Sequence, residues 1–299
     1  MKKRDLSIVI LNYNTRDLLR SCLDSIEKNR DDLNLEILVA DNGSRDYSLE
    51  MVKNDFPKVK IVANENNLGF AKGNNQALKK ATSDFVLLLN PDTVVQTKTL
   101  VTCLAFIKKN PEVGALTCRV DLANGELDEA CHRGFPTPWN AFCYFSGLIK
   151  IFPREKIFAG YLLGHLNKTT IHQIDSASGA FLIIRAKAGR ELNWLDEDFF
   201  WYGEDLDFCY RLKKKNWQIF FLPQVKIIHH KGMASGIKKH SAKISQADRE
   251  TKLRSVRAST EAMRLFYQKH YVEKYSKIVT QLVLNMIGLL EFIRVRRVK

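Results

Sequence analysis

The chain has 299 residues, of which 45% are hydrophobic and 27% are charged. These values are ordinary for globular proteins and exclude collagen-like, fully disordered and multispan membrane chains. The length suits one large α/β domain, alone or with a helical appendage. The apolar run Leu6 to Leu11 is too short for a signal-peptide core, and the six cysteines form no Cys-x-x-Cys pair. We therefore expect an intracellular protein with reduced thiols.

The net charge of +14 is distributed unevenly along the chain. Residues 231–299 carry sixteen Lys and Arg against five Asp and Glu, a net of +11, whereas the first 230 residues carry only +3. The basic character therefore belongs to the tail. A basic tail attracts polyanions, either nucleic acid or an anionic bilayer surface.

Strand and helix signals alternate over the first ninety residues. Short apolar runs predict strands at 6–11, 36–40, 59–63 and 84–89. Apolar residues at helical spacing predict helices at 18–26, 49–56 and 70–81. This alternation predicts an α/β fold, with a mostly parallel sheet that carries helices on its faces.

The second half of the chain is less regular. Residues 121–175 mix aromatic residues, Pro and Gly without a clear period, and we interpret them as a variable insertion near the site. The elements predicted beyond them are strands at 177–184, 218–222 and 225–229 and a helix at 204–215. After Lys231 the pattern changes to a basic loop and two helices, 247–269 and 274–295.

Asn and Asp follow each of the first four predicted strands. The residues at these positions are Asn12, Asn14, Asp41, Asn42, Asn64, Asn67, Asn90 and Asp92. The carboxyl ends of parallel strands form the ligand crevice of such sheets. Asn and Asp are also common turn residues, but four such strand ends in succession favour a binding rim.

Several nucleotide and catalytic motifs are absent from the sequence. No Gly-x-Gly-x-x-Gly follows the first strand, and Gly69 to Gly73 lacks the Gly-Lys-Ser/Thr of a P-loop. His-Glu-x-x-His and Gly-x-Ser-x-Gly are absent as well. Dinucleotide-binding, P-loop, zincin and α/β-hydrolase chemistry are therefore not expected.

Acidic and histidine residues remain as candidates for chemistry. Asp92 follows Pro91 at a strand end, where it is either a turn residue or a ligand for Mg²⁺ or Mn²⁺, which complete their shells with water and phosphates. Glu204, Asp205 and Asp207 open a helix. Such acids favour the positive end of the helix dipole, or one of them acts as a general base.

Two further features lie close to these acids along the chain. Trp201 and Tyr202 offer a face on which a sugar ring could stack. His229 and His230 end an apolar strand, where a His serves as a metal ligand, a phosphate donor or a structural residue.

Seven segments in order carry a family resemblance. They are SIVILNYN (7–14), VADNGS (39–44), NNLGFAKGNN (66–75), LLLNPDT (87–93), SGA (178–180), GEDLD (203–207) and HHKG (229–232). Together they resemble glycosyltransferase family 2 and, more narrowly, its bacterial rhamnosyltransferase-like branch. The match covers roughly residues 5–235. It implies a GT-A fold, Rossmann-like and built for nucleoside-diphosphate sugars, with a C-terminal helical extension, and inverting transfer of the sugar.

The resemblance also implies roles for individual residues. The nucleotide-sugar-binding residues would be Asn12, Tyr13, Asn14, Asp41, Asn67, Gly69, Asn74, Asn90 and Asp92. Asp205 would be the general base with Glu204 shaping its environment, and the acceptor side would hold Ser178, Gly179, Trp201 and Tyr202. A Mg²⁺ or Mn²⁺ ion would bind Asp92 and His229, since His229 fits the family position better than His230. Asn90 replaces the first acid of the family's Asp-x-Asp motif and leaves Asp92 as the main carboxylate.

The resemblance further suggests a division of the chain. Residues 1–235 would form the GT-A catalytic domain, with 121–175 as an acceptor-side insertion, and 236–299 a basic helical tail. In that tail, Ile278 to Ile293 form an apolar stripe of sixteen residues that contains Glu291, short of the ~20 needed to span a bilayer. It is typical of an in-plane membrane helix, and the alternative is packing on the catalytic domain or on a second subunit.

The expected partners and location follow from this interpretation. The partners are a nucleoside-diphosphate sugar, a glycan or polyprenyl-linked acceptor and an anionic membrane, and the location is cytoplasmic, on the inner face of the cytoplasmic membrane. A sugar nucleotidyltransferase would need a Gly-rich, basic signature after the first strand, which Asn12 to Arg16 does not supply. A nucleic-acid-binding protein is opposed by the near-neutral body, so no nucleic acid is expected.

Overall fold

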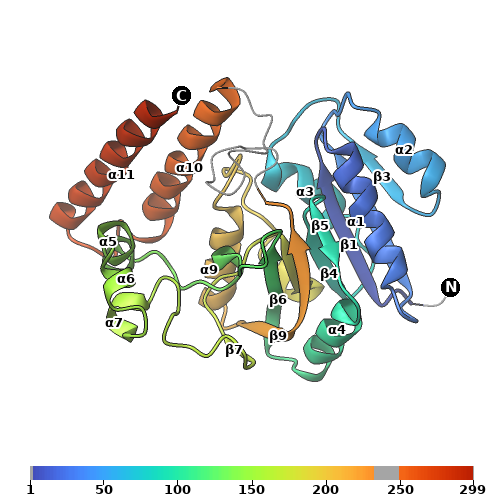
Figure 1. The fold of residues 1–299 in the computed structure, drawn as a ribbon, viewed down its shortest axis with the longest axis horizontal. Helices are drawn as coiled ribbons and strands as arrows, with labels where there is room; N and C mark the ends of the chain where they lie inside the picture. The colour runs from blue at the N-terminus through green and yellow to red at the C-terminus, as the bar shows by residue number, and fades with distance from the viewer. Residues whose placement is uncertain (1–2, 232–248, 299) are drawn as a thin grey trace.

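The computed structural model describes residues 3–231 and 249–298, and Figure 1 shows an α/β core with two helices at the end far from the N-terminus. The first four strands are β1 (Leu6–Asn12), β2 (Leu35–Asp41), β3 (Lys60–Ala63) and β4 (Phe85–Leu89). They are mutually parallel in the order β3-β2-β1-β4, as the alternation predicted. The intervening helices are α1 (Arg16–Lys28), α2 (Ser48–Asp55) and α3 (Phe70–Leu78).

The second half of the sheet is mixed rather than parallel. Its strands are β5 (Thr93–Val95), β6 (Val113–Leu122), β7 (His172–Gln173), β8 (Phe181–Arg185) and β9 (Gln218–His229). Strand β8 runs antiparallel between β4 and β6, and β5 and β7 run antiparallel to β9. The prediction of a mostly parallel sheet is therefore right for β1–β4 and for the pair β6–β9, and wrong for β5, β7 and β8. Antiparallel partners need no helical crossover, so the helix–strand alternation says nothing about them.

Two predicted strand boundaries differ from the structure. The strands expected at 218–222 and 225–229 are one strand, β9, whose pairing with β6 shifts register between Cys118 and Arg119. The strand expected at 177–184 begins only at Phe181. Ala177 to Ala180 therefore form a loop that leads into β8.

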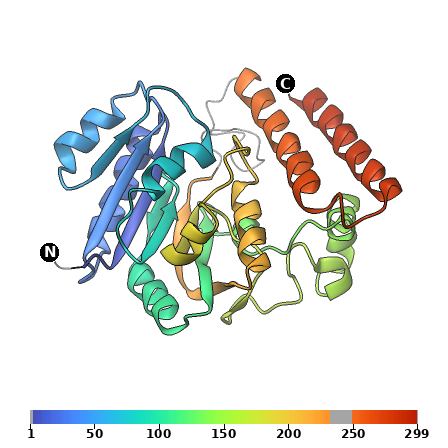
Figure 2. The same ribbon diagram turned by 180° about the vertical axis from the view of Figure 1, so that it is seen from behind.

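The remaining elements include parts that the sequence pattern did not reveal. They are α4 (Thr99–Lys109), the 3₁₀ turn η1 (Glu129–Cys131), α5 (Pro138–Ser146), α6 (Leu148–Ile151), α7 (Lys156–Ala159), α8 (Ala186–Glu191) and α9 (Glu204–Lys214). The insertion 121–175 thus contains three short helices. Figure 2 shows these helices, in light green, at the same end of the molecule as the C-terminal helices.

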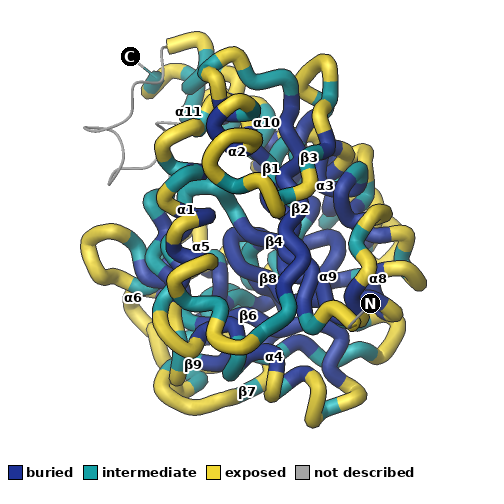
Figure 3. Tube along the Cα trace, turned by 90° about the vertical axis from the view of Figure 1, so that its right-hand side faces the viewer, coloured by how far each residue is buried: buried dark blue, intermediate teal, exposed yellow. Residues whose placement is uncertain are grey.

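The main core fills both faces of the sheet. In Figure 3 the central strands of the sheet are buried, while exposed loops and helix faces surround them. Strands β1, β2 and β4 are rich in Val, Ile and Leu and almost wholly buried, as expected for strands covered on both faces. All six cysteines are buried and free.

The two C-terminal helices are α10 (Arg249–His270) and α11 (Lys277–Arg297), close to the predicted ranges. A second hydrophobic cluster joins Phe199, Leu206 and Tyr210 to Phe266 of α10 and to Tyr271, which follows that helix. Helix α10 therefore packs on α9 and on the loop before it.

Helix α11 is different, because it packs on α10 along one face only. Val283 and Leu284 contact the second cluster and Ile287 is buried, whereas Ile278 and Leu282 are 75% and 59% exposed. Among the described residues, α11 is the helix that by length and composition could cross a membrane. The helix has 21 residues, and its apolar part is the predicted stretch Ile278 to Ile293, which Lys277 and Arg294 flank. The basic loop expected after Lys231 and before α10, which includes Gly232 of the HHKG segment, lies outside the described residues.

Candidate active site

The ends of β1 and β2 meet at one edge of the sheet. Asn12 and Asp41 are partners in the parallel register, and Asn12 Nδ2 donates to Asp41 Oδ1 at 2.7 Å. Ser44 adds its backbone N–H at 2.8 Å and its hydroxyl at 2.6 Å to the same carboxylate. Both Asn12 and Asp41 are fully buried, so the Asp41 carboxylate is held rigidly behind the rim.

Asn42 connects the end of β2 to the loop that follows β3. Its Nδ2 donates to the Gly69 carbonyl at 3.0 Å and to Asn67 Oδ1 at 3.2 Å, and its Oδ1 accepts from Asn64 Nδ2 at 3.0 Å. Gly69 has φ +82°, and a Cβ there would lie 2.6 Å from the Phe200 carbonyl. Only glycine fits this position, which brings the Asn67 loop against the aromatic loop before α9.

Three predicted nucleotide-binding residues have other local environments. Tyr13 is 47% exposed, and Asn14 adopts φ +53° while its Oδ1 accepts from the Arg45 N–H at 2.8 Å. Asn74 is buried and donates to the Phe70 carbonyl within its own helix at 3.0 Å. Asn74 is therefore engaged in helix α3, and the loop around Tyr13 and Asn14 is the accessible part of the first strand end.

Asp92 and His229 lie next to each other at the end of β9. His229 Nε2 is 3.2 Å from Asp92 Oδ1, and its Nδ1 is 3.2 Å from Asp128 Oδ2. Lys231 Nζ completes the group at 2.6 Å from Asp128 Oδ1. The predicted pair is thus brought together, with Asp128 behind it. His230 instead donates its backbone N–H to the Asp92 carbonyl at 2.8 Å.

Charge interactions dominate the titration of this group. Burial alone would lower the pKa of His229, but Asp92 and Asp128 raise that pKa to about 9. Burial alone would raise the pKa values of Asp92 and Asp128, but His229 outweighs it, and both lie below their usual value. The group is therefore an imidazolium held between two carboxylates, with Lys231 balancing the second.

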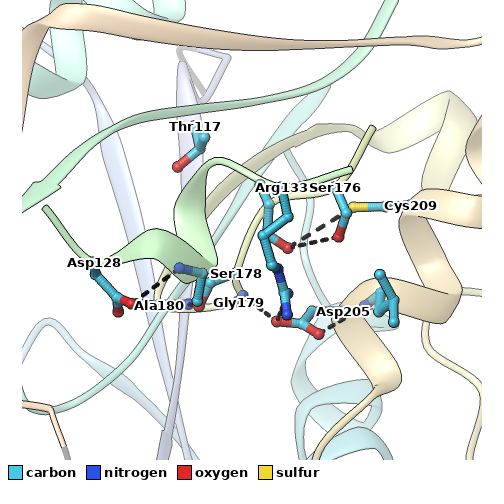
Figure 4. A network of polar contacts seen from close by, with 12 residues as sticks. Thr117, Asp128, Arg133, Ser176, Ser178, Gly179, Ala180, Asp205 and Cys209 are labelled. Atoms are coloured by element: carbon cyan, nitrogen blue, oxygen red, sulfur yellow. Dashed lines mark hydrogen bonds and ion pairs between the residues drawn. The ribbon is translucent and has the colours of Figure 1, made fainter. Parts of the chain in front are cut away.

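Asp205 lies at the start of α9, facing the loop before β8. Figure 4 shows Arg133 and the Gly179 backbone both directed at its carboxylate, and Oδ2 lies 3.2 Å from Arg133 Nη2 and 3.3 Å from the Gly179 N. The neighbouring Ala180 carbonyl accepts from the Asn90 N–H at 3.2 Å. The Gly179–Ala180 segment therefore links Asp205 to the strand end that carries Asn90 and Asp92.

The other two acids of α9 have structural environments. Glu204 is buried, its Oε2 has no hydrogen-bond partner, and burial followed by the charge of Asp205 raises its pKa to about 8. Asp207 is fully buried between Arg211 Nε at 2.6 Å and His270 Nε2 at 2.7 Å. Asp205 is thus the acid of this set that reaches the rim.

The predicted acceptor-side residues come from two segments, the loop before β8 and the loop before α9. Ser178 Oγ accepts from the Ala180 N–H at 3.1 Å, which shapes the loop at Gly179. The rings of Trp201 and Tyr202 stack with centroids 5.0 Å apart, and the Tyr202 hydroxyl lies 2.8 Å from Ser255 Oγ of α10. Tyr202 therefore ties the loop to α10, while Trp201 is partly exposed.

Sequence reasoning missed Asp128 and Arg133. Both belong to residues 121–175, which show no periodicity, and they contact residues 101 and 72 positions away. The sequence carries no local signal for them, because the need of Asp128 for a partner comes from its burial, which only the structure reveals. Within the described residues, no group of three or more His, Cys, Asp or Glu side chains is arranged to hold a metal ion.

The mixed sheet, with acids at its strand ends and a carboxylate at the start of α9, defines a GT-A-type nucleotide-sugar glycosyltransferase. Residues 7–167 match the model of the family described as Glycosyl transferase family 2, and the chain belongs to this family. Its resemblance to the rhamnosyltransferase-like branch is confirmed by two relatives of that kind.

Three known proteins share modest sequence identity with this chain and match most of its length. Rhamnosyltransferase WbbL of Escherichia coli (strain K12) is 23% identical over 75% of this chain and 82% of its own length. N-acetylglucosaminyl-diphospho-decaprenol L-rhamnosyltransferase of Mycobacterium tuberculosis (strain ATCC 25618 / H37Rv) is 24% identical over 68% of each chain. Mannosyltransferase PcManGT from Pyrobaculum calidifontis, solved with GDP-Man and Mn²⁺, has a TM-score of 0.57 at 15% identity, covering 99% of this chain and 88% of its own. This structural likeness shows the GT-A fold.

Proposed function

We propose that this enzyme transfers a sugar, with inversion, from a nucleoside diphosphate to a hydroxyl of a cell-envelope glycan or lipid-linked acceptor. The observation that carries the proposal is the placement of Asp205. Arg133 and the Gly179 N–H hold one carboxylate oxygen, and Gly179–Ala180 joins it to the Asn90–Asp92 strand end. These contacts hold the proposed base, Asp205, in a defined position relative to the proposed donor site.

The donor is proposed to be dTDP-rhamnose, supported by the names of the two rhamnosyltransferase relatives. The nucleoside would lie against the Asn12–Asn14 loop, with Asp41 toward the nucleobase. The Asn67–Gly69 loop and Asn90 would line the nucleotide-sugar. Ser178, Gly179, Trp201 and Tyr202 remain proposed for the acceptor side, and no nucleic acid is involved.

The residues around Asp92 fit a divalent cation, Mg²⁺ or Mn²⁺. His229 directs Nε2 toward Asp92, and the Asp128 carboxylate contacts Nδ1. In metal sites, a carboxylate at the second ring nitrogen orients the His side chain in the same way. Two protein ligands suffice where phosphates and water complete the shell. A cation bound by Asp92 and by His229 Nε2, which would give up its proton on metal binding, would stabilise the charge that develops on the leaving diphosphate.

The transfer step follows from the geometry of Asp205. Its carboxylate accepts the proton of the acceptor hydroxyl while that oxygen forms a bond to the anomeric carbon from the face opposite the diphosphate. The bond between that carbon and the diphosphate oxygen breaks, and its electron pair leaves with the nucleoside diphosphate. Arg133 and Gly179 keep the carboxylate oriented throughout.

The first experiment is a calorimetric titration with UDP, dTDP and GDP, each with Mn²⁺ and with EDTA. We expect binding selective for dTDP that requires the cation, and Asp92→Ala should weaken it by about tenfold or more because it removes a ligand. The exposed Asp55→Asn is the control. Unchanged affinity of Asp92→Ala in the presence of Mn²⁺ would remove Asp92 from the site.

The second experiment tests the base. Asp205→Asn keeps the shape of the side chain but cannot accept the proton, so turnover should fall by about 10²–10⁴-fold. The dTDP affinity of the same variant should stay that of the wild type. Normal turnover of Asp205→Asn would disprove the role.

We also propose that residues 1–235 act as the catalytic domain, with 121–175 on the acceptor side and 236–299 as a membrane-associating tail. The exposed stripe of α11 and the basic Arg296 and Arg297 support a position on the cytoplasmic membrane's inner face. An in-plane helix is favoured because Arg264 of α10 pairs with Glu291 at 2.7 Å and ties α11 to the protein.

A further inference from the structure

Large exposed apolar side chains concentrate on two segments. Among the eighteen such side chains of the described residues, six lie on α11 and seven on α5–α7 and their connections. The seven, which we call the α5–α7 patch, are Trp139, Phe142, Tyr144, Phe145, Ile151, Phe152 and Ile157. A gathering of this kind marks an interaction surface, since single exposed apolar residues are normally scattered.

The α5–α7 patch is a built surface rather than a loose loop. Trp139 Nε1 donates to the Ile157 carbonyl at 2.7 Å, which fixes α5 to α7. The Trp139 ring lies 5.7 Å from that of Phe142, and Phe152 stacks on Phe158 at 4.9 Å. The aromatic rings therefore hold one another in place while their outer faces remain exposed.

Basic residues alternate with the apolar ones on this surface. Residues 150–157 are exposed throughout; Lys150 precedes Ile151 and Phe152, and Arg154 and Lys156 lie between these two and Ile157. Glu155 is the one acid between residues 138 and 159. Apolar side chains next to Lys and Arg, with a Trp, are the composition that binds anionic lipid headgroups and the upper acyl region.

The patch is adjacent to the tail. Figures 1 and 2 both show α5–α7 and α10–α11 at the same end of the molecule. The Arg294 guanidinium of α11 lies 6.0 Å from the centre of the Phe145 ring. The exposed stripe of α11 and the α5–α7 patch are therefore neighbouring parts of one end of the protein.

We infer that the α5–α7 patch docks on an anionic bilayer together with α11, so that the enzyme contacts the membrane at two places. Arg133, which holds Asp205, precedes α5 by only a few residues. Docking through the patch therefore brings the acceptor side of the site next to the lipid surface. This deepens the proposed function by making the acceptor a lipid-linked one, and rests on it for that point alone.

The test exploits the burial of all six native cysteines. Ile151→Cys in the patch, Leu282→Cys on α11 and Tyr47→Cys at the opposite end each introduce an exposed thiol, because these side chains are 68%, 59% and 70% exposed. Each full-length variant is labelled with an environment-sensitive NBD probe. It is then mixed with vesicles of equal parts phosphatidylglycerol and phosphatidylcholine.

We expect NBD emission to rise several-fold and move to shorter wavelength at positions 151 and 282, and to stay constant at 47. Lys150→Glu with Lys156→Glu should weaken vesicle binding several-fold. Lys53→Glu with Lys58→Glu changes the net charge equally on the far side and should weaken it less. Equal weakening by both pairs would overturn the role of the patch.

Other outcomes separate the inference from the proposed function. A response at 282 without one at 151 would overturn the docking of the patch and leave the tail proposal standing. A response at 151 that grows with protein concentration without vesicles would assign the patch to a second copy and overturn the inference. The dTDP titration on the same labelled proteins reports independently whether the donor site is intact.

Discussion

Glu204 and Asp205 are neighbours in the chain but occupy opposite environments. Asp205 has an Arg and a backbone N–H as partners at the rim, whereas Glu204 is buried with an unpartnered oxygen. A buried carboxyl without partners favours its neutral form. One turn of helix therefore holds an acid at the rim with an Arg partner and a neighbouring acid whose pKa burial raises.

The raised pKa of Glu204 makes a pH dependence of stability testable. Between the ordinary Glu pKa and about 8, the native state holds a proton that the unfolded chain has released, so wild-type stability falls as pH rises through this window. Glu204→Gln has no such proton, so its free energy of unfolding should not fall in this window. The difference in free energy of unfolding between the variant and the wild type should therefore shift in favour of the variant by on the order of a few kcal/mol between about pH 5 and about pH 9. Urea unfolding at both pH values measures it. The exposed Glu126→Gln should follow the wild type, and parallel curves for Glu204→Gln would contradict the prediction.

At the scale of elements, α10 supports the helix that carries Asp205. Phe266 and Tyr271 pack on Leu206 and Tyr210, and His270 binds the buried Asp207. Ser255 adds a contact to Tyr202 in the preceding loop. Helix α10 is therefore part of the framework of the site, although it lies in the tail of the sequence.

Breaking the contact between α9 and α10 should be costly. His270→Ala leaves the buried Asp207 with Arg211 as its remaining side-chain partner and removes a buried hydrogen bond to Asp207, so the free energy of unfolding should fall by about 3 kcal/mol. The exposed pair Arg254–Glu250 is the matched control, and Arg254→Ala should cost less than about 1 kcal/mol. Urea unfolding of both variants compares them. Equal decreases in the free energy of unfolding of the two variants would contradict the prediction that the buried pair contributes more than the exposed pair.

At the scale of the whole molecule, the tail of the sequence combines most of the net charge with exposed apolar surface. The sequence from residue 231 contributes +11 of the net +14, and α11 exposes Ile278, Leu282 and Met286. Electrostatic attraction is screened by salt, whereas burial of apolar surface is not. The two contributions to membrane binding are therefore separable.

Co-sedimentation with anionic vesicles measures both contributions. Raising NaCl from about 0.1 M to about 1 M shortens the Debye length from about 10 Å to about 3 Å, so the bound fraction should fall several-fold. Leu282→Gln with Met286→Gln should weaken binding at both salt concentrations, and Tyr47→Ser should not. Binding that is insensitive to salt and to these substitutions would exclude the tail as the membrane contact.

Much of the site was predictable because its signals are local. The buried strands and their Asn and Asp ends specify the parallel half of the sheet, and the register pairs Asn12 with Asp41 as the crevice argument requires. The GEDLD segment indicated the acids of α9, and only the family resemblance selected Asp205 among them as the base. Burial alone separates Asp205 at the rim from Glu204 and Asp207 inside.

The sequence by itself determined the α/β class, the family, the strand ends of the rim and the two C-terminal helices. The tertiary structure decided the antiparallel insertion of β8, the partners Arg133 and Asp128, and the support of α9 by α10. The physical reason is the distance along the sequence over which each kind of interaction acts. Periodicity and turn chemistry act within a few residues, whereas the partner of a buried charge is chosen by chain topology, here across separations of 63 to 101 residues.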